Sequence, residues 1–310
     1  MRVFLAGASG VIGKPLVEQL VAAGHEVSGM TSKPANSASI ARRGGRAVVC
    51  DALDAEATSA AVAEARPEVV ISQLTRLPKD DFDPRKIDYE PTNRARAGGG
   101  HNLLEAAKAV GARRFVTQSV AFIYEPQGSR VKDEEAPVWT DPPEPFLSGA
   151  APTLEHEREV LEAEIEGLVL RYGFFYGPGT YYAADGGTAR QVRSRRFPIV
   201  GRGAGVFSFV HTDDAAAATV AACERGAPGI YNVVDDEPAP LREWLPYYAE
   251  ALGAKRPFRA PTFLARIVGG AFATIMATEL RGASNAKAKR ELGWQPRYPS
   301  WREGFREALG

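Results

Sequence analysis

A glycine-rich turn near the start of the chain constrains the fold more than any other feature. The turn, Gly7-Ala8-Ser9-Gly10-Val11-Ile12-Gly13, separates an apolar run at residues 2–6 from a helical pattern at residues 14–23. At a strand–helix junction, glycines allow a tight turn, close packing of helix on strand and close approach of a ligand pyrophosphate. The unpaired N–H groups of the helix then face the phosphates. The placement therefore predicts a dinucleotide-binding unit.

The alternation of strand and helix patterns continues through the first half of the chain. Further strands are predicted at residues 26–30, 47–50, 69–74, 114–118 and 168–171, and helices at 54–65, 93–110 and 153–164. After residue 172 the chain contains more Gly, Pro and aromatic residues, with strands at 206–210 and 230–234 around a helix at 213–224. This order predicts an α/β fold, a Rossmann-type doubly wound parallel sheet with a smaller, mostly helical C-terminal substrate domain. We expect the sheet domain at 1–171, with 204–233 returning to it, and the substrate domain at 172–203 and 234–310.

The charge balance and the cysteine content exclude several classes of protein. The 310 residues include 38 Lys and Arg and 38 Asp and Glu, so the chain lacks the basic field of a nucleic-acid or anionic-membrane binder. Cys50 and Cys223 alone build neither a disulfide framework nor a cysteine zinc site, which indicates a reducing, cytoplasmic location. The uncharged stretch 267–277 is shorter than the ~20 residues that a membrane span needs. The four histidines lack HxxxH or HExxH spacing, so no metal site is expected.

Several later segments carry a resemblance to a known family. The turn has GxxGxxG spacing, and the segments that follow it read Cys50-Asp51-Ala52-Leu53-Asp54, Asn102-Leu103-Leu104-Glu105, Leu170-Arg171-Tyr172-Gly173-Phe174-Phe175, Val210-His211-Thr212-Asp213-Asp214 and Ser284-Asn285-Ala286-Lys287. In this order they resemble the extended branch of the short-chain dehydrogenase/reductase superfamily, the NAD(P)-dependent epimerases, dehydratases and reductases. The resemblance spans nearly the whole chain and implies a nicotinamide cofactor and a small-molecule substrate.

The resemblance also implies which residues bind the cofactor along the sheet edge. They are Gly7, Ser9, Gly10, Val11, Ile12 and Gly13 in the turn, then Thr31, Ser32, Lys33, Asp51, Ala52, Gln73, Leu74, Thr75 and Gln118, and finally Tyr172, Gly173, Phe174 and Phe175. The second strand ends Met30-Thr31-Ser32-Lys33, without the carboxylate that binds the adenosine ribose of NAD. Ser32 and Lys33 instead suit a 2′-phosphate, which favours NADP and leaves NAD possible. The alternative is that Lys33 is a solvated loop residue.

The catalytic pair that the family usually carries is missing. A Tyr and a Lys four residues apart normally share one helix face and act with a Ser or Thr. Alignment of the helix before the sixth strand puts Gly149 at the Tyr position and Thr153 at the Lys position, and no YxxxK occurs in the chain. Ser119 and Tyr124 are the catalytic candidates, although Ser119 can be a loop serine and Tyr124 a packed aromatic. Further candidates are Tyr176, Tyr181, Tyr182 and His156 as proton donors, and an arginine cluster at residues 190–196 that is either a phosphate site or a solvated helix face.

Three functions fit these residues. The first is an NADP(H)-dependent oxidoreductase that acts on a small organic substrate without the usual acid. The second is a nucleotide-sugar epimerase or dehydratase, against which the missing base counts. The third is a sensor of NADP, or a non-redox catalyst, on the same scaffold. The resemblance further implies a homodimer, because small residues at 95 and 97–100 permit close helix pairing.

Overall fold

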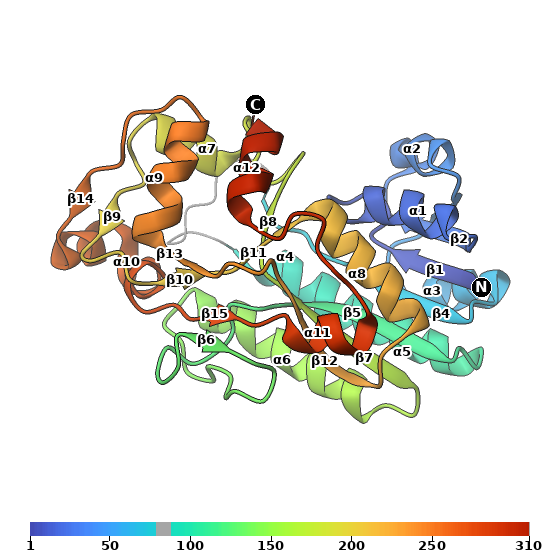
Figure 1. Ribbon diagram of the computed structural model, residues 1–310. Helices are drawn as coiled ribbons and strands as arrows, with labels where there is room; N and C mark the ends of the chain where they lie inside the picture. Colours follow the sequence, from blue (N-terminus) through green and yellow to red (C-terminus); the bar gives the residue numbers. More distant parts are fainter. Residues whose placement is uncertain (79–87, 310) are drawn as a thin grey trace.

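The computed structural model describes residues 1–78 and 88–309. Its centre is a seven-stranded parallel sheet in the order β12-β7-β5-β4-β1-β2-β3 (Figure 1). The strands are β1 (Arg2–Ala6), β2 (Glu26–Thr31), β3 (Arg46–Val49), β4 (Val69–Ser72), β5 (Arg114–Val120), β7 (Glu166–Tyr172) and β12 (Gly229–Val233). The chain builds outward from β1 to β3, and it then places β4 and the later strands on the other side of β1. The carboxyl ends of β1 and β4 therefore form the switch point at which open α/β sheets bind ligands.

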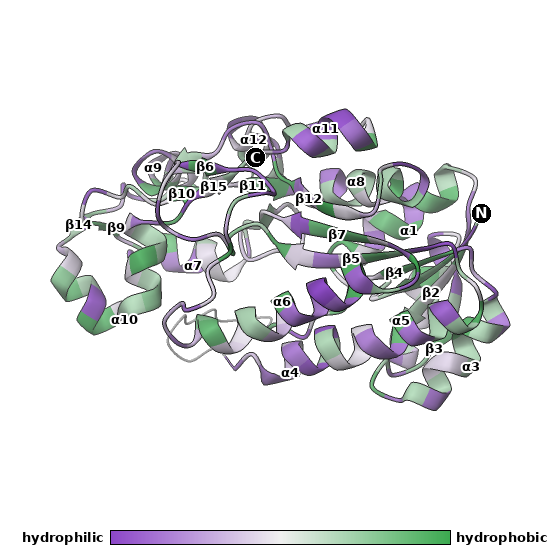
Figure 2. Ribbon diagram, turned by 90° about the horizontal axis from the view of Figure 1, so that it is seen from below, coloured by the Kyte–Doolittle hydropathy of each residue, from purple (hydrophilic) through white to green (hydrophobic). Residues whose placement is uncertain are grey.

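Helices cover both faces of this sheet (Figure 2). One face carries α1 (Gly13–Ala22) and α8 (Thr212–Glu224), and the other carries α3 (Ala55–Ala65), α5 (Gly99–Ala109) and α6 (Phe146–Glu162). The short segments η1 (Pro34–Asn36) and α2 (Ser37–Arg42) join β2 to β3, and α11 (Ala286–Leu292) packs against α8 and β12. Because both faces are covered, strands such as β4 are buried at every position, which is why they read as apolar runs.

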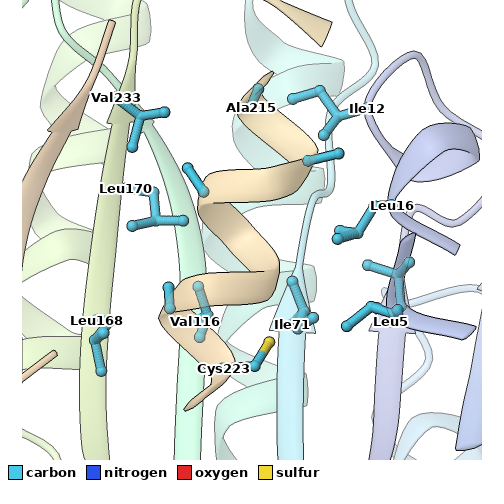
Figure 3. Packing of buried hydrophobic residues seen from close by; sticks show 14 of the residues in the cluster. Leu5, Ile12, Leu16, Ile71, Val116, Leu168, Leu170, Ala215, Cys223 and Val233 are labelled. Atoms are coloured by element: carbon cyan, nitrogen blue, oxygen red, sulfur yellow. The ribbon is translucent and has the colours of Figure 1, made fainter. Parts of the chain in front are cut away.

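The core beneath α8 explains much of the alanine in the sequence. Four alanines of this helix are fully buried, Ala215, Ala216, Ala218 and Ala222. Short side chains let α8 lie close to β5, β7 and α1. Figure 3 shows Ile71, Val116 and Leu170 of three neighbouring strands around this helix.

Short strands and helices outside the central sheet form a smaller unit at one end of it (Figure 2). Four short strand pairs join it: β8 (Phe174–Tyr176) with β11 (Phe209–His211), β9 (Ile199–Val200) with β14 (Arg259–Ala260), β10 (Val206–Phe207) with β13 (Ala239–Pro240), and β6 (Val131–Lys132) with β15 (Gly282–Ala283). Its helices are α7 (Gly187–Arg193), α9 (Leu241–Ala251), α10 (Thr262–Thr278) and α12 (Trp301–Leu309). Its core is rich in aromatic rings, among them Phe209, Trp244, Tyr248, Trp301 and Phe305.

The structure confirms the predicted parallel α/β architecture, and three predicted elements differ clearly from the observed ones. The helix predicted at 153–164 begins earlier, because α6 includes Phe146 and continues through Pro152. The single helix predicted at 93–110 is divided into α4 (Glu90–Asn93), a π-helical segment η2 (Arg94–Gly98) and α5. The strand predicted at 206–210 is two strands, β10 and β11. Helix α10 bends at Gly270, whose φ of 83° interrupts the helix.

Within residues 1–78 and 88–309, no helix combines the length and the apolar character needed to cross a bilayer. The same part of the chain contains no group of three His, Cys, Asp or Glu side chains arranged to hold a metal ion.

Candidate active site

The glycine turn lies between β1 and α1, at the switch point of the sheet. Gly7 has a φ of +86°, and a Cβ atom on it would lie 2.4 Å from the Gln73 carbonyl oxygen. A Cβ on Gly13 would lie 2.1 Å from the Gly7 oxygen, so both positions exclude any side chain. Gly10 is exposed, and a Cβ there would meet only the Gly7 oxygen, at 3.1 Å. Gly7 and Gly13 therefore serve the packing of the turn, whereas Gly10 leaves its outer side open to a ligand.

The N-terminus of α1 follows this open side. No side chain caps the helix, and its Lys14 N–H already donates to the Gly10 oxygen at 3.1 Å. The N–H groups of Val11 and Ile12, just before the helix, make no hydrogen bond within the described residues and are left for another partner. An uncapped helix N-terminus behind a glycine turn fits the pyrophosphate of a dinucleotide. The residues present therefore fit a nicotinamide dinucleotide, with Gly10, Val11 and Ile12 beside its phosphates.

Three polar side chains order the end of β2. The hydroxyls of Ser9 and Thr31 lie 3.1 Å apart, and the Asn36 amide donates to the Ser9 hydroxyl at 3.1 Å. The Lys33 backbone N–H donates to the Thr31 hydroxyl at 3.3 Å, while the Lys33 side chain is exposed. Residues 31–36 contain no carboxylate. Asn36 was missed by the sequence reasoning, because nothing in its local pattern marks a residue that reaches back to the glycine turn.

Asp51 lies beyond β3 and already has partners. Its carboxylate accepts hydrogen bonds from the Arg76 guanidinium at 3.0 and 3.1 Å and from the Leu53 N–H at 3.1 Å. The Leu53 hydrogen bond, followed by the Arg76 contacts, lowers the pKa of Asp51. Neighbouring Ala52 is buried, and its carbonyl oxygen accepts from the Asn102 amide at 2.8 Å. The loop at the adenine end of the predicted site is thus held in place by hydrogen bonds. Arg76, which the sequence did not indicate, supplies two of them.

Side chains at the ends of β4, β5 and β7 are joined beneath the predicted cofactor position. The Gln73 amide donates to the Tyr172 hydroxyl at 2.9 Å, and that hydroxyl lies 2.7 Å from the Thr219 hydroxyl on α8. Burial raises the pKa of Tyr172. The Tyr172 ring therefore belongs to the core, and only its backbone reaches the sheet edge. Two further predicted residues form a hydrogen bond, in which the Gln118 amide donates to the Leu74 oxygen. Thr75 is exposed, and Phe175 packs against the Tyr172 ring with centroids 5.3 Å apart.

Ser119 and Tyr124 belong to one buried polar network. The Ser119 hydroxyl donates to the Glu157 carboxylate, which also accepts from Arg171 at 3.0 and 2.5 Å. The Arg171 guanidinium lies 5.2 Å from the centre of the Tyr124 ring, and the Tyr124 hydroxyl donates to Asn232 at 2.7 Å. All five side chains are buried. Both candidate hydroxyls therefore donate to buried side chains, Ser119 to Glu157 and Tyr124 to Asn232. Burial also raises the pKa of Tyr124.

Gly149 and Thr153, the positions that the resemblance aligns with the family's Tyr and Lys, contribute to the structure of α6. The Thr153 hydroxyl donates to the Gly149 carbonyl oxygen at 2.9 Å. Pro152 has no N–H, which frees the carbonyl of Ser148 one turn earlier. The Asn93 amide donates to that carbonyl at 2.6 Å. Asn93, at the end of α4, therefore supplies the hydrogen bond to Ser148 that Pro152 removes from α6.

The ring of Tyr89 fills the space above Gly149. A Cβ on Gly149 would lie 2.8 Å from Cδ1 of Tyr89. The nearby Arg96 guanidinium is buried, and its Nε has no hydrogen-bond partner among the described residues. Burial raises the pKa of Tyr89 to about 12, although the charge of Arg96 acts in the opposite direction. A phenol and a cation thus lie near the empty Tyr–Lys position, on a segment that the sequence analysis did not consider for catalysis.

The remaining candidates lie in the core or in surface contacts. Tyr176 and Tyr182 are buried in the aromatic core, and Tyr181 donates to the Pro78 oxygen. His156 contacts Glu159 on the same helix at 3.0 Å. In the arginine cluster, Arg190 and Arg193 donate to the carbonyl oxygens of Asp185 and Ala184.

Comparison with known proteins decides the family. The sequence profile of the NAD dependent epimerase/dehydratase family matches residues 3–233. The chain belongs to this family. Among its relatives, a 3-diazoavenalumate denitrifying reductase from a Streptomyces species is 50% identical over 98% of this chain and 99% of the relative. A 2-alkyl-3-oxoalkanoate reductase from Stenotrophomonas maltophilia is 24% identical over 97% of this chain and 91% of the relative.

Solved structures of the epimerase/dehydratase family share the fold. The UDP-glucose 4-epimerase of Thermus thermophilus in complex with NAD is 26% identical, with a TM-score of 0.74 over 100% of this chain and 98% of that chain. A human epimerase family protein with NADPH is 21% identical, with a TM-score of 0.76 over 100% of this chain and 99% of that chain. Family neighbours thus bind NAD or NADPH, which agrees with the glycine turn and uncapped helix of this family member.

Proposed function

We propose that the protein is an NADPH-dependent reductase that delivers a hydride to the diazonium group of an aromatic substrate, which then loses N₂. The observation that carries the proposal is the replacement of the Tyr–Lys pair by Gly149 and Thr153, neither of which ionises. The relative that shares half of its residues is by name a denitrifying reductase of a diazo compound. An acceptor of that kind suits a site without the usual acid.

The chemistry of the acceptor explains why the pair is dispensable. A bound reduced nicotinamide supplies a hydride. A ketone that accepts a hydride becomes an alkoxide and needs a proton from an acid. An aryl diazonium ion that accepts a hydride at its terminal nitrogen becomes a neutral aryl diazene. The diazene releases N₂ and keeps the hydrogen on the ring carbon, so no side chain has to give or take a proton.

The chain's own residues hold and orient the reactants. Gly10, Val11 and Ile12 receive the pyrophosphate, and Ser32 and Lys33 receive a 2′-phosphate, which is the basis for proposing NADPH rather than NADH. Gly173 and Phe174, directly after β7, back the nicotinamide. The Ser119 and Tyr124 network keeps the ends of β5 and β7 fixed beneath it. We also propose that the protein acts as a cytoplasmic homodimer, with residues 172–203 and 234–310 as its substrate domain.

A second candidate function is supported by the position of Tyr89. Its phenol and the buried Arg96 occupy the neighbourhood in which relatives keep a Tyr and a Lys. With Tyr89 as the acid, the protein would reduce a ketone, as the names of two more distant relatives describe. Tyr89→Phe would then abolish activity, whereas it leaves diazonium reduction intact.

An isotope experiment tests the proposal. The protein is incubated without oxygen with benzenediazonium and NADPH that carries deuterium at nicotinamide C4, and the arene and N₂ are measured by mass spectrometry. We expect deuterium on the ring carbon, and NADPH oxidation well above that of the Gly10→Asp variant, which controls for the uncatalysed reaction. Ser119→Ala and Tyr124→Phe should retain turnover, because no acid is needed.

Three outcomes would contradict diazonium reduction without an acid. Deuterium transfer to a ketone but not to the arene would assign the second candidate function. Tight NADPH binding with no transfer to either acceptor would favour a sensor. A loss of roughly 10²–10⁴-fold in the Ser119→Ala or Tyr124→Phe variant would instead make that hydroxyl a general acid.

A further inference from the structure

The first half of α10 turns its apolar side to the solvent. Phe263 and Ile267 lie about one helical turn apart and are 65% and 77% exposed. Leu264, on the adjoining side of the helix, is 45% exposed. Ala265, on the opposite side, packs against the aromatic core of the smaller unit. A surface helix of a globular protein normally faces the core with its apolar side, so this helix is inverted.

The same half of α10 protrudes from the molecule. Within residues 262–268, every residue except Ala265 is exposed. Gly270, where the helix bends, separates this part from a second half in which Phe272 is buried. Figure 2 shows α10 at the end of the molecule far from the N-terminus, coloured mostly as hydrophobic. Exposed apolar residues that gather on one element indicate a surface that contacts a partner.

The segments around the protruding helix are basic. Residues 187–205 and 251–278 contain nine of the 38 basic residues of the chain and none of its 38 acidic residues. The two segments are neighbours, because β9 pairs with β14 and the Arg259 guanidinium donates to the Gly201 oxygen at 3.1 Å. The equal totals of the whole chain, which argue against a membrane-binding protein, therefore conceal a local basic region.

The basic region and the apolar residues form one surface. The Arg195 guanidinium lies 5.8 Å from the centre of the Phe258 ring, and Phe258 is itself 44% exposed. Six exposed arginines of the region form no ion pair with any described residue: Arg195, Arg196, Arg202, Arg256, Arg259 and Arg266. Their charge is therefore not neutralised within the described part of the chain, and it attracts an anionic partner.

We propose that this surface, made of Phe258, Phe263, Leu264 and Ile267 with the six arginines, binds the headgroup region of an anionic lipid bilayer. Apolar side chains on a helix with cations beside it are the combination by which proteins lie in a membrane interface. The apolar groups enter the boundary between headgroups and acyl chains, and the arginines attract the anionic headgroups. An acidic protein would need a groove around a helix that is exposed on nearly every side, whereas lipids rearrange around it.

Sedimentation of vesicles with the full chain tests the proposal. The protein is mixed with vesicles of phosphatidylcholine alone, or of phosphatidylcholine and phosphatidylglycerol in equal parts, at about 0.1 M and about 0.5 M salt. We expect binding to the anionic vesicles at low salt, at least about 10-fold weaker binding to the neutral vesicles, and weaker binding at high salt.

Two pairs of substitutions remove the two parts of the surface. Phe263→Ser together with Ile267→Ser should weaken binding about 10-fold or more, because these side chains no longer leave water. Arg256→Gln together with Arg266→Gln should weaken binding to anionic vesicles roughly 30-fold, about 5-fold for each charge. Because all four side chains are exposed, the variants should keep the unfolding temperature of the wild type.

Matched pairs in the sheet domain serve as controls. Val49→Ser together with Leu161→Ser removes exposed apolar side chains, and Arg42→Gln together with Arg158→Gln removes exposed charges. Both control pairs should bind anionic vesicles as the wild type does. This comparison separates a local surface from an effect of the overall charge or hydrophobicity.

Four results would overturn the proposal. The first is no binding to anionic vesicles at low salt, and the second is equal binding to neutral vesicles. The third is binding that either surface pair leaves unchanged. The fourth is capture on immobilised polyglutamate without binding to vesicles, which would assign the surface to an acidic protein.

Discussion

The ring of Tyr89 lies against the backbone of Gly149, so closely that a Cβ on the glycine would be 2.8 Å from Cδ1 and 2.9 Å from Cγ of the ring. The family resemblance predicts the catalytic tyrosine at this position of the helix. The Tyr89 ring occupies the space that a side chain on residue 149 would need.

This contact predicts a strong coupling between the two residues. Gly149→Ala should destabilise the protein by about 1–3 kcal/mol, because the added methyl group overlaps the ring. In a Tyr89→Ala background the same substitution should be neutral or stabilising by up to about 1 kcal/mol, since alanine favours a helix over glycine. Urea unfolding of the four proteins measures the coupling. Equal costs of Gly149→Ala in both backgrounds would mean that the ring does not occupy this position.

The contribution of Asn93 to stability should depend on the presence of Pro152. Its amide satisfies the Ser148 carbonyl that the proline leaves free, so Asn93→Ala should cost roughly 0.5–1.5 kcal/mol of unfolding free energy. In a Pro152→Ala background the new N–H can bond to Ser148, and the cost of Asn93→Ala should shrink towards zero. Chemical denaturation with and without the Pro152→Ala change decides the matter, and an undiminished cost would assign Asn93 another role.

Substitutions of the turn glycines should affect different properties, cofactor binding at Gly10 and stability at Gly13. Gly10→Asp should keep the fold, because Gly10 is exposed and its Cβ would meet only the Gly7 oxygen, at 3.1 Å, but its carboxylate repels the pyrophosphate and should abolish NADPH binding. Gly13→Ala should unfold or strongly destabilise the protein, by about 3 kcal/mol or more, because its Cβ would overlap backbone atoms. Thermal melting and NADPH fluorescence titration distinguish the two effects. A folded Gly10→Asp protein with unchanged affinity would place the cofactor elsewhere.

Lys33 should decide which nucleotide is preferred. Its side chain is exposed beside the end of β2 and is free to pair with a 2′-phosphate. Lys33→Ala should weaken NADPH binding roughly 5- to 30-fold and leave NADH unchanged, which corresponds to about 1–2 kcal/mol. Arg158→Ala, which removes an exposed arginine of α6, provides the comparison. If the wild type binds both nucleotides equally, or if Lys33→Ala weakens both, the preference has no basis in this loop.

His156 should make the protein less stable in mild acid. Burial lowers its pKa below the ordinary 6.5, although Glu159 and Glu157 act to raise it and His101 adds to the lowering. The folded protein therefore binds fewer protons at this side chain than the unfolded chain does, and stability falls as the pH drops below about 6.5. His156→Gln should make the urea midpoint less dependent on pH between 7.5 and 5.5. An unchanged pH dependence in His156→Gln would contradict the assignment.

The sequence predicted those features that depend on neighbouring residues. The glycine turn and the strands around it follow from local patterns. The empty Tyr and Lys positions were also visible, because they are a matter of spacing along one helix.

Contacts between distant segments were not predictable in the same way. Tyr89 reaches Gly149 and Asn36 reaches Ser9 across the fold, and no short pattern marks either pair. Ser119 was identified, but its acceptor Glu157 lies on another element and reads as an ordinary helix glutamate.

The buried carboxylate of Glu157 binds both Ser119 and Arg171, and this sharing limits how the protein can evolve. Loss of Arg171 leaves an unpaired interior charge, and loss of Glu157 leaves another of opposite sign, so neither can change alone without a cost of about 3–5 kcal/mol. Lineages that descend from this chain should therefore keep the arginine and the glutamate together or replace them together. The serine, which contributes only a hydroxyl, can drift first. Its replacement in a relative would mark an early stage of the exchange of the whole network for an apolar one.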